Sequence, residues 1–176
     1  MIDLLKNRRS IRKYKNKPVE KEKIEKILKS ALLSPSSRSK RPWEYIVVQD
    51  QHIIEQLSKS KEHGSAFIKD APLLIVVIAD ESKCDVWVED ASIASIIIQL
   101  EAEKLDLGSC WIQIRKRLHN TEITSEAYVK GILEIPEPYK VLSIIAIGYK
   151  DDEKESYNLE ELAYDKIHYN QFTTKG

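Results

Sequence analysis

Apolar residues recur along the chain with two different spacings, and these spacings predict its helices and strands. A period near 3.6 residues indicates amphipathic helices, and short runs rich in β-branched residues indicate strands. The predicted helices cover residues 2–5, 18–33, 52–59, 87–107 and about 125–133. The predicted strands cover residues 45–48, 73–79, 109–114 and 141–147.

Two of these segments lack the usual polar face. The run 73–79 is apolar throughout, which is typical of a strand covered on both sides. The segment 87–107 has almost no polar face before Glu101 and Glu103, so we expect a central helix. Its own domain would cover one side, and a second subunit is the most economical cover for the other. Gly108 is expected to end this helix.

The composition is that of an ordinary globular protein. With 176 residues, 42% hydrophobic and 32% charged, the chain suits a single domain. Two cysteines, Cys84 and Cys110, are too few for a disulfide scaffold and favour a reducing compartment. The N-terminus is too charged for a signal peptide, and no apolar run approaches the length of a membrane span. We therefore predict a cytoplasmic protein that does not enter the membrane.

Charge is balanced overall but locally concentrated. Lys plus Arg and Asp plus Glu both number 28, yet residues 6–17 carry seven cations and no anion. Arg8, Arg9, Ser10 and Arg12 form a dense set of donors, and the planar guanidinium binds phosphate through two hydrogen bonds. A basic site within a neutral protein favours a small anionic ligand over nucleic acid. A solvated basic arm and a nucleic-acid module are the alternatives.

Several kinds of catalytic site find no support in the sequence. The four histidines are scattered and have no carboxylate at metal-ligand spacing. No serine lies in a Gly-x-Ser-x-Gly motif, and the five glycines form no phosphate-binding Gly-x-Gly-x-x-Gly motif. We therefore predict neither a metal site nor a catalytic side chain.

Four separated segments carry the remaining chemical information: Arg8–Arg12, Ser34–Trp43, Lys69–Pro72 and Leu107–Ile114. In this order they closely resemble the nitroreductase family of homodimeric flavin enzymes, which hold FMN at the subunit interface. The resemblance extends to about Lys154 and, more loosely, through residues 167–169.

This resemblance implies one FMN-binding domain over residues 1–176. The implied fold is α+β with three layers, in which helices flank a central mixed, mostly antiparallel sheet. A long central helix would lie at the interface of an intertwined homodimer. The tail from about residue 155 to 176 is expected to pack on the partner subunit.

The resemblance also assigns residues to the cofactor. Arg8, Ser10 and Arg12 match the element that holds the FMN phosphate and the pyrimidine edge of the flavin, and Arg9 lies between them. We expect Arg8, Ser10 or Arg12 to stabilise the reduced, anionic flavin near N1 and O2. Three further groups would complete the site. Residues of one loop would reach the partner's flavin: Pro35, Ser36, Ser37 and Ser39. Backbone N–H groups would face the reactive edge of the flavin from Trp111, Ile112, Gln113 and Ile114, and Lys154, or in its place Lys150, would lie near the phosphate.

Three positions depart from the family pattern. Ser39 stands where the family usually has Asn, Arg41 where it has Gln, and Ile114 where Gly is common. Ser39 keeps one hydrogen bond where an amide makes two. The branched side chain of Ile114 is expected to narrow the space above the flavin. These differences affect substrate range more than cofactor binding.

The implied activity is an FMN-dependent oxidoreductase. Hydride would pass from NADH or NADPH through N5 of the flavin to a nitroaromatic, quinone or similar small acceptor, in a ping-pong cycle. The cofactor carries the chemistry, while the protein binds and orients it. The alternative is a flavin-binding sensor or reservoir with little turnover.

Overall fold

The computed structural model describes residues 1–172, and every helix and strand predicted from the apolar pattern is present. The helices are α1 (Ile2–Asn7), α2 (Lys21–Leu32), α3 (Gln51–Leu57), α4 (Trp87–Lys104) and α5 (Ser125–Leu133). The strands are β1 (Trp43–Val48), β2 (Leu73–Asp80), β3 (Gly108–Gln113) and β4 (Tyr139–Gly148). Their ends differ by a few residues from the predicted ends.

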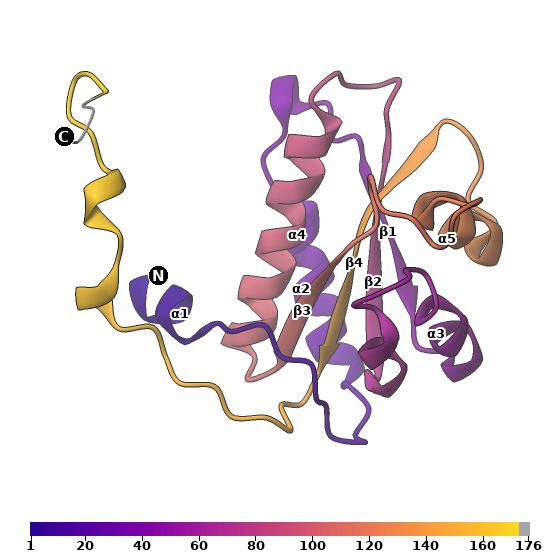
Figure 1. Ribbon diagram of the computed structural model, residues 1–176, viewed down its shortest axis with the longest axis horizontal. Coiled ribbons are helices and arrows are strands. Elements are labelled where there is room, and N and C mark those ends of the chain that lie inside the picture. The colour runs from indigo at the N-terminus through magenta and orange to yellow at the C-terminus, as the bar shows by residue number, and fades with distance from the viewer. Residues whose placement is uncertain (173–176) are drawn as a thin grey trace.

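The four strands form one sheet in the order β1-β2-β4-β3, with every neighbouring pair antiparallel. Side chains of the central strand β2 alternate between two cores. Leu73 and Ile75 pack in the core with α2 and α4, whereas Leu74 and Val76 pack in the core with α3 and α5. Figure 1 shows these two pairs of helices on opposite faces of the sheet. All eight residues of β2 are buried, because helices cover both faces of the sheet. The predicted three-layer α+β fold is thus confirmed, and β3 is left at an edge.

Helix α4 covers the sheet with one side only. Ala91, Ala94 and Ile98 are fully buried, while Ile93 and Ile96 on the outer side are 39% and 37% exposed. This exposed apolar side matches the expectation of a second cover. Even so, no helix within residues 1–172 is long and apolar enough to cross a membrane.

The prediction that Gly108 ends the long helix is wrong. Helix α4 stops at Lys104, and the left-handed residue that redirects the chain is Asp106, with φ of 61°. Aspartate tolerates this conformation better than most residues. Gly108 instead begins β3, where a Cβ atom would lie 2.8 Å from Cβ of Ile11. Its missing side chain lets the N-terminal segment approach the strand.

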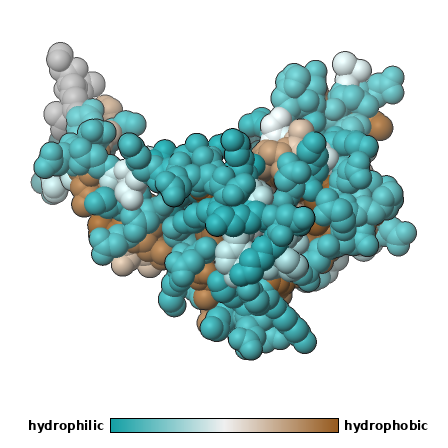
Figure 2. Space-filling model, turned by 90° about the horizontal axis from the view of Figure 1, so that it is seen from below, coloured by the Kyte–Doolittle hydropathy of each residue, from teal (hydrophilic) through white to brown (hydrophobic). Residues whose placement is uncertain are grey.

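The two chain ends form an arm, consisting of residues 1–7 and 153–172, that projects from the three layers (Figure 1). The N–H of Tyr157 donates to the carbonyl oxygen of Lys6 (3.0 Å), and the hydroxyl of Ser156 donates to Asn7 (2.8 Å). Figure 2 shows apolar surface on the side that carries the arm. The exposed large apolar residues of its C-terminal part are Tyr157, Leu159, Leu162, Tyr164, Ile167, Tyr169 and Phe172. Residues 173–176 of the predicted tail lie outside the described residues.

Candidate functional site

The basic N-terminal segment is fixed against the outer edge of β3. The N–H of Ile11 donates to the carbonyl oxygen of Ser109 (3.0 Å), and Ser10 forms a parallel bridge with Ser109. The Ile11 side chain is buried against Gly108, where only glycine leaves room. Residues on either side of Ile11 are therefore held in an extended conformation beside the strand.

Extended geometry divides the predicted phosphate ligands between two sides, because successive side chains point in opposite directions. Burial raises the pKa of the Cys110 thiol, and Arg12, the Ser10 side chain and Arg8 counteract this rise. These three groups therefore gather around Cys110. Arg9 lies elsewhere: its guanidinium is 4.4 Å from the centre of the Tyr157 ring and donates to the carbonyl oxygen of Glu155.

The side of the segment that faces Cys110 is a donor set without anions. None of Arg8, Arg12 and Lys61 forms an ion pair with any carboxylate among residues 1–172. The Arg12 guanidinium lies 5.9 Å from the centre of the Phe67 ring. Burial lowers the pKa of Lys61, and the nearby Arg117 lowers it further. A phosphate would relieve this repulsion, so the donor set fits the phosphate of FMN.

Lys61 was not predicted from the sequence. It lies in a polar loop about fifty positions from both segments that it approaches, and no local spacing marks it. Only the fold brings it near Cys110 and Arg117.

The edge strand β3 presents backbone donors in alternation. Because the carbonyl of Ser109 points outward to Ile11, antiparallel geometry also directs the N–H groups of Trp111 and Gln113 away from β4. The Nε1–H of Trp111 donates to Oε1 of Gln113 (2.9 Å), which fixes both side chains along the edge.

The expected N–H contacts from Ile112 and Ile114 are not supported by this geometry. Ile112 alternates toward β4, and the N–H of Ile114 donates to the carbonyl oxygen of Leu142 (3.2 Å). The expectation that the Ile114 side chain narrows the space above the flavin is also wrong. That side chain is fully buried in the core on the α3 and α5 side.

The predicted loop 35–39 lies at the opposite end of α4 from the basic segment. The N–H of Ser37 donates to Oδ1 of Asp90 (2.8 Å), a buried carboxylate in the first turn of α4 that also accepts from the Cys84 thiol (3.5 Å). Arg38 pairs with Asp85. An 18-residue helix spans about 27 Å, so one chain does not bring this loop to Arg8 and Arg12.

The two late lysines lie on the Arg9 side of the segment. Lys154 pairs with Asp152 (3.0 Å), and Lys150 pairs with Glu103 of α4 (2.6 Å). Both line a hollow of about 410 Å³ together with Arg9 and Ile11. Which of them approaches the phosphate stays a prediction.

Comparison with known proteins identifies the family. A sequence model described as "Nitroreductase family" matches residues 5–63 and 55–149. The chain belongs to the nitroreductase family. A solved structure described as an FMN-dependent nitroreductase from Clostridium difficile R20291 is 54% identical and has a TM-score of 0.96. The match covers 98% of this chain and 100% of that one.

Two archaeal family members align over nearly the whole chain, and each has a name that gives NADH dehydrogenase/NAD(P)H nitroreductase as a provisional activity. The protein from Archaeoglobus fulgidus is 36% identical over 172 residues, which is 95% of each chain. The protein from Methanothermobacter thermautotrophicus is 35% identical over 171 residues, 96% of this chain and 85% of that one. The nitroreductase resemblance found in the sequence is therefore confirmed.

Proposed function

We propose that this chain is an FMN-dependent oxidoreductase that oxidises NADH or NADPH and reduces a nitroaromatic, quinone or similar small acceptor in a ping-pong cycle. One observation supports the proposal most: the donor set of Arg8, Ser10 and Arg12, whose arginines form no ion pair within residues 1–172, lies beside an edge strand with outward N–H groups. The 54% identical neighbour, named as FMN-dependent, supports the same cofactor.

Each group has a distinct task in this proposal. Arg8 and Ser10 hold the phosphate, and Arg12, next to the Phe67 ring, stabilises negative charge at the pyrimidine edge. The N–H groups of Trp111 and Gln113 orient the reactive edge. FMN, when bound, accepts hydride from the nicotinamide and supplies electrons to the acceptor. The chain's own residues bind, orient and polarise, so no general base is required.

We further propose that the whole chain is one FMN-binding domain and that two copies form an intertwined homodimer. The loop 35–39 lies at the far end of α4 from Arg8 and Arg12, so a second chain is needed to bring both to one flavin. The exposed Ile93 and Ile96 and the apolar arm offer surface for such a partner. The predicted packing of the tail on the partner and the cytoplasmic location remain part of this proposal.

The first experiment is anaerobic titration of the purified, FMN-supplemented protein with NADH and NADPH. We expect the flavin absorbance at about 450 nm to bleach and to recover when a quinone or nitroaromatic is added. A protein that binds FMN but turns over slowly with every acceptor would instead be a flavin sensor or reservoir. A protein that binds no FMN would contradict the proposal. Sedimentation velocity tests the dimer separately.

A further inference from the structure

A second basic group follows β3 directly, at the opposite end of the strand from Ser10 and Arg12. Arg115, Lys116 and Arg117 line a hollow of about 360 Å³ where β3 leaves the sheet. The sequence shows these residues only as a basic turn, and the flavin site described above does not use them. The other residues that line the hollow are Glu81, Trp87, Thr124, Glu126 and Lys140.

The backbone of this turn is tied to its surroundings. The carbonyl oxygen of Arg115 accepts from Nε2 of Gln113 (2.9 Å), and the N–H of Arg117 donates to the carbonyl oxygen of Ile114 (3.1 Å). The Arg115 guanidinium also lies 5.6 Å from the centre of the Trp87 ring, at the start of α4. Ordered arginines lose less conformational freedom when they bind a ligand. The turn and the Arg115 side chain are thus held in place at the hollow.

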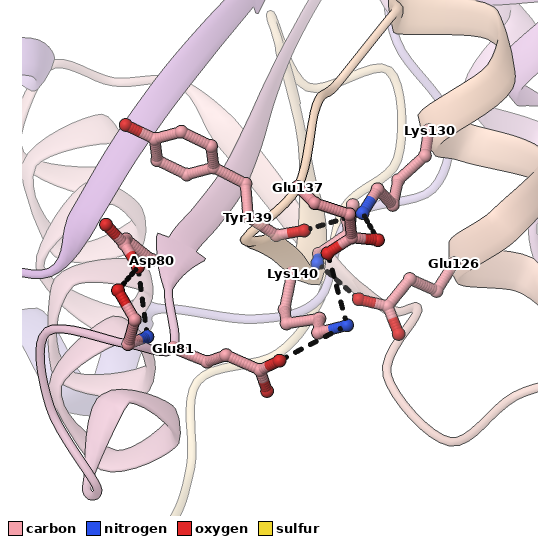
Figure 3. Close-up of polar contacts among 9 residues, drawn as sticks. Asp80, Glu81, Glu126, Lys130, Glu137, Tyr139 and Lys140 are labelled. Carbon is pink, nitrogen blue, oxygen red and sulfur yellow. Dashed lines mark hydrogen bonds and ion pairs between the residues drawn. The ribbon is translucent and has the colours of Figure 1, made fainter.

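The carboxylates of the hollow are already engaged. Oε1 of Glu81 lies 3.3 Å from Nζ of Lys140, and Oε1 of Glu126 accepts from the N–H of Val141 (2.8 Å; Figure 3). In contrast, none of the three cations of the turn forms an ion pair with a carboxylate in the described part of the chain. Three cations without carboxylate partners beside one hollow favour an anionic ligand.

We propose that this hollow binds the phosphate groups of the nicotinamide dinucleotide, with its nicotinamide at the edge of β3. The inference rests on the proposed function, because it assigns a place to the reductant of that reaction. Gln113, whose N–H faces the open edge, is the last residue of β3, and its side-chain amide donates to the carbonyl oxygen of Arg115 (2.9 Å), so the basic turn begins beside this edge. A ribose separates the nicotinamide from its pyrophosphate, so one dinucleotide would extend from this edge to the arginines. Two phosphate sites would then lie at the two ends of one strand.

The test measures the dissociation constants of NAD⁺ and NADP⁺ by calorimetry on the FMN-loaded protein. The test variant is Arg115→Gln/Arg117→Gln. Lys21→Gln/Lys29→Gln removes the same charge from the exposed side of α2, where both side chains are at least 75% exposed. Charge-assisted hydrogen bonds to phosphate are strong, so we expect the arginine variant to weaken dinucleotide binding roughly tenfold or more. The lysine control should change it less than about twofold, and both should retain full FMN occupancy.

Unchanged binding in the arginine variant, or equal weakening in both variants, would overturn the inference. If the double variant does not fold, Arg117→Gln alone, at an exposed side chain, gives the same comparison. If the wild type oxidises NAD(P)H and the arginine variant binds the dinucleotide as tightly as the wild type, only the dinucleotide site is refuted. A protein whose arginines bind the dinucleotide but whose FMN is never reduced refutes only the proposed function. Steady-state kinetics add a second readout: KM for NAD(P)H should rise while kcat at saturation is retained.

Discussion

The basic segment 8–12 and the loop 35–39 were both predicted to contact FMN, yet the fold treats them differently. The segment docks on β3 of its own chain, and Arg8 and Arg12 form no ion pair with a carboxylate among the described residues 1–172. The loop is tied to α4 through Asp90, and its arginine, Arg38, is paired with Asp85. The first region presents charged donors to an anion, whereas the second has its Ser37 N–H and its Arg38 guanidinium already bound to carboxylates.

This difference separates two roles within one predicted site. Unpaired cations contribute binding energy to an anion, while a loop held by a buried carboxylate contributes shape and position. The loop also lies about one α4 length away, so its role requires a second chain. Substitutions in the segment should therefore change FMN affinity directly. Substitutions at the loop should first change stability or dimer geometry.

The largest effect is expected where the segment meets β3. In Gly108→Val, the new Cβ would lie 2.8 Å from Cβ of Ile11, and backbone and side chain must shift. We expect a stability loss of about 1–3 kcal/mol and displacement of the segment, with FMN lost from the purified protein. Gly131→Ala is the matched control, because no atom lies within 4 Å of its Cβ position on α5. The free energy of unfolding of this control should rise by about 0.5–1 kcal/mol. Thermal unfolding and FMN content measure both, and full FMN occupancy in Gly108→Val would refute the docking argument.

The next effect distinguishes neighbouring arginines. Arg12→Ala and Arg8→Ala each remove a charged donor, which typically contributes about 1.5–3 kcal/mol, so the Kd for FMN should rise at least tenfold. Arg9→Ala should change it much less, because Arg9 contacts Tyr157 and Glu155 instead. Fluorescence titration of FMN gives the three constants. Arg12→Ala should also lower the flavin reduction potential, and an unchanged potential would remove Arg12 from the pyrimidine edge.

At the loop, Asp90→Asn should have a smaller effect that appears mainly in stability. The buried carboxylate accepts from the Ser37 N–H and the Cys84 thiol, and the amide weakens both hydrogen bonds. We expect the free energy of unfolding to fall by about 1–2 kcal/mol. Asp85→Asn, which breaks the exposed pair with Arg38, should cost less than about 0.5 kcal/mol. Chemical denaturation compares them, and a larger loss in Asp85→Asn would contradict the assigned role of Asp90.

The sequence predicted those parts of the molecule that local patterns determine. The apolar run of β2 indicated a strand covered on both faces, and its alternating side chains indeed fill two cores. The nearly uniform apolarity of α4 indicated a second cover, and Ile93 and Ile96 are exposed accordingly. The order of four short motifs was enough for the family. In each case, the information lies in spacing along the chain.

Features that depend on distant contacts were missed or misassigned. Gly108 looked like a helix stop, because its true constraint, Ile11, lies almost one hundred residues earlier in the sequence. Lys61 and Asp90 joined the site only through folding. The separation of Arg9 from Arg8 and Arg12 follows from the extended backbone that β3 imposes. Strand alternation therefore also decides which N–H groups of residues 111–114 point outward.

The smallest predicted effect is a pH dependence that would show whether Lys61 belongs to the donor set. Burial and Arg117 lower its pKa below the ordinary lysine value of about 10.4. At a pH between the lowered pKa of the folded protein and the ordinary pKa of the unfolded chain, the unfolded chain binds more protons than the FMN-free folded protein. Stability should therefore rise with pH in this window. FMN binding should weaken over the same range, because deprotonated Lys61 no longer attracts phosphate. Lys61→Gln should reduce both slopes, while Lys59→Gln in the same loop should leave both unchanged. If FMN affinity in the wild type rises with pH together with stability, instead of falling, Lys61 lies outside the donor set.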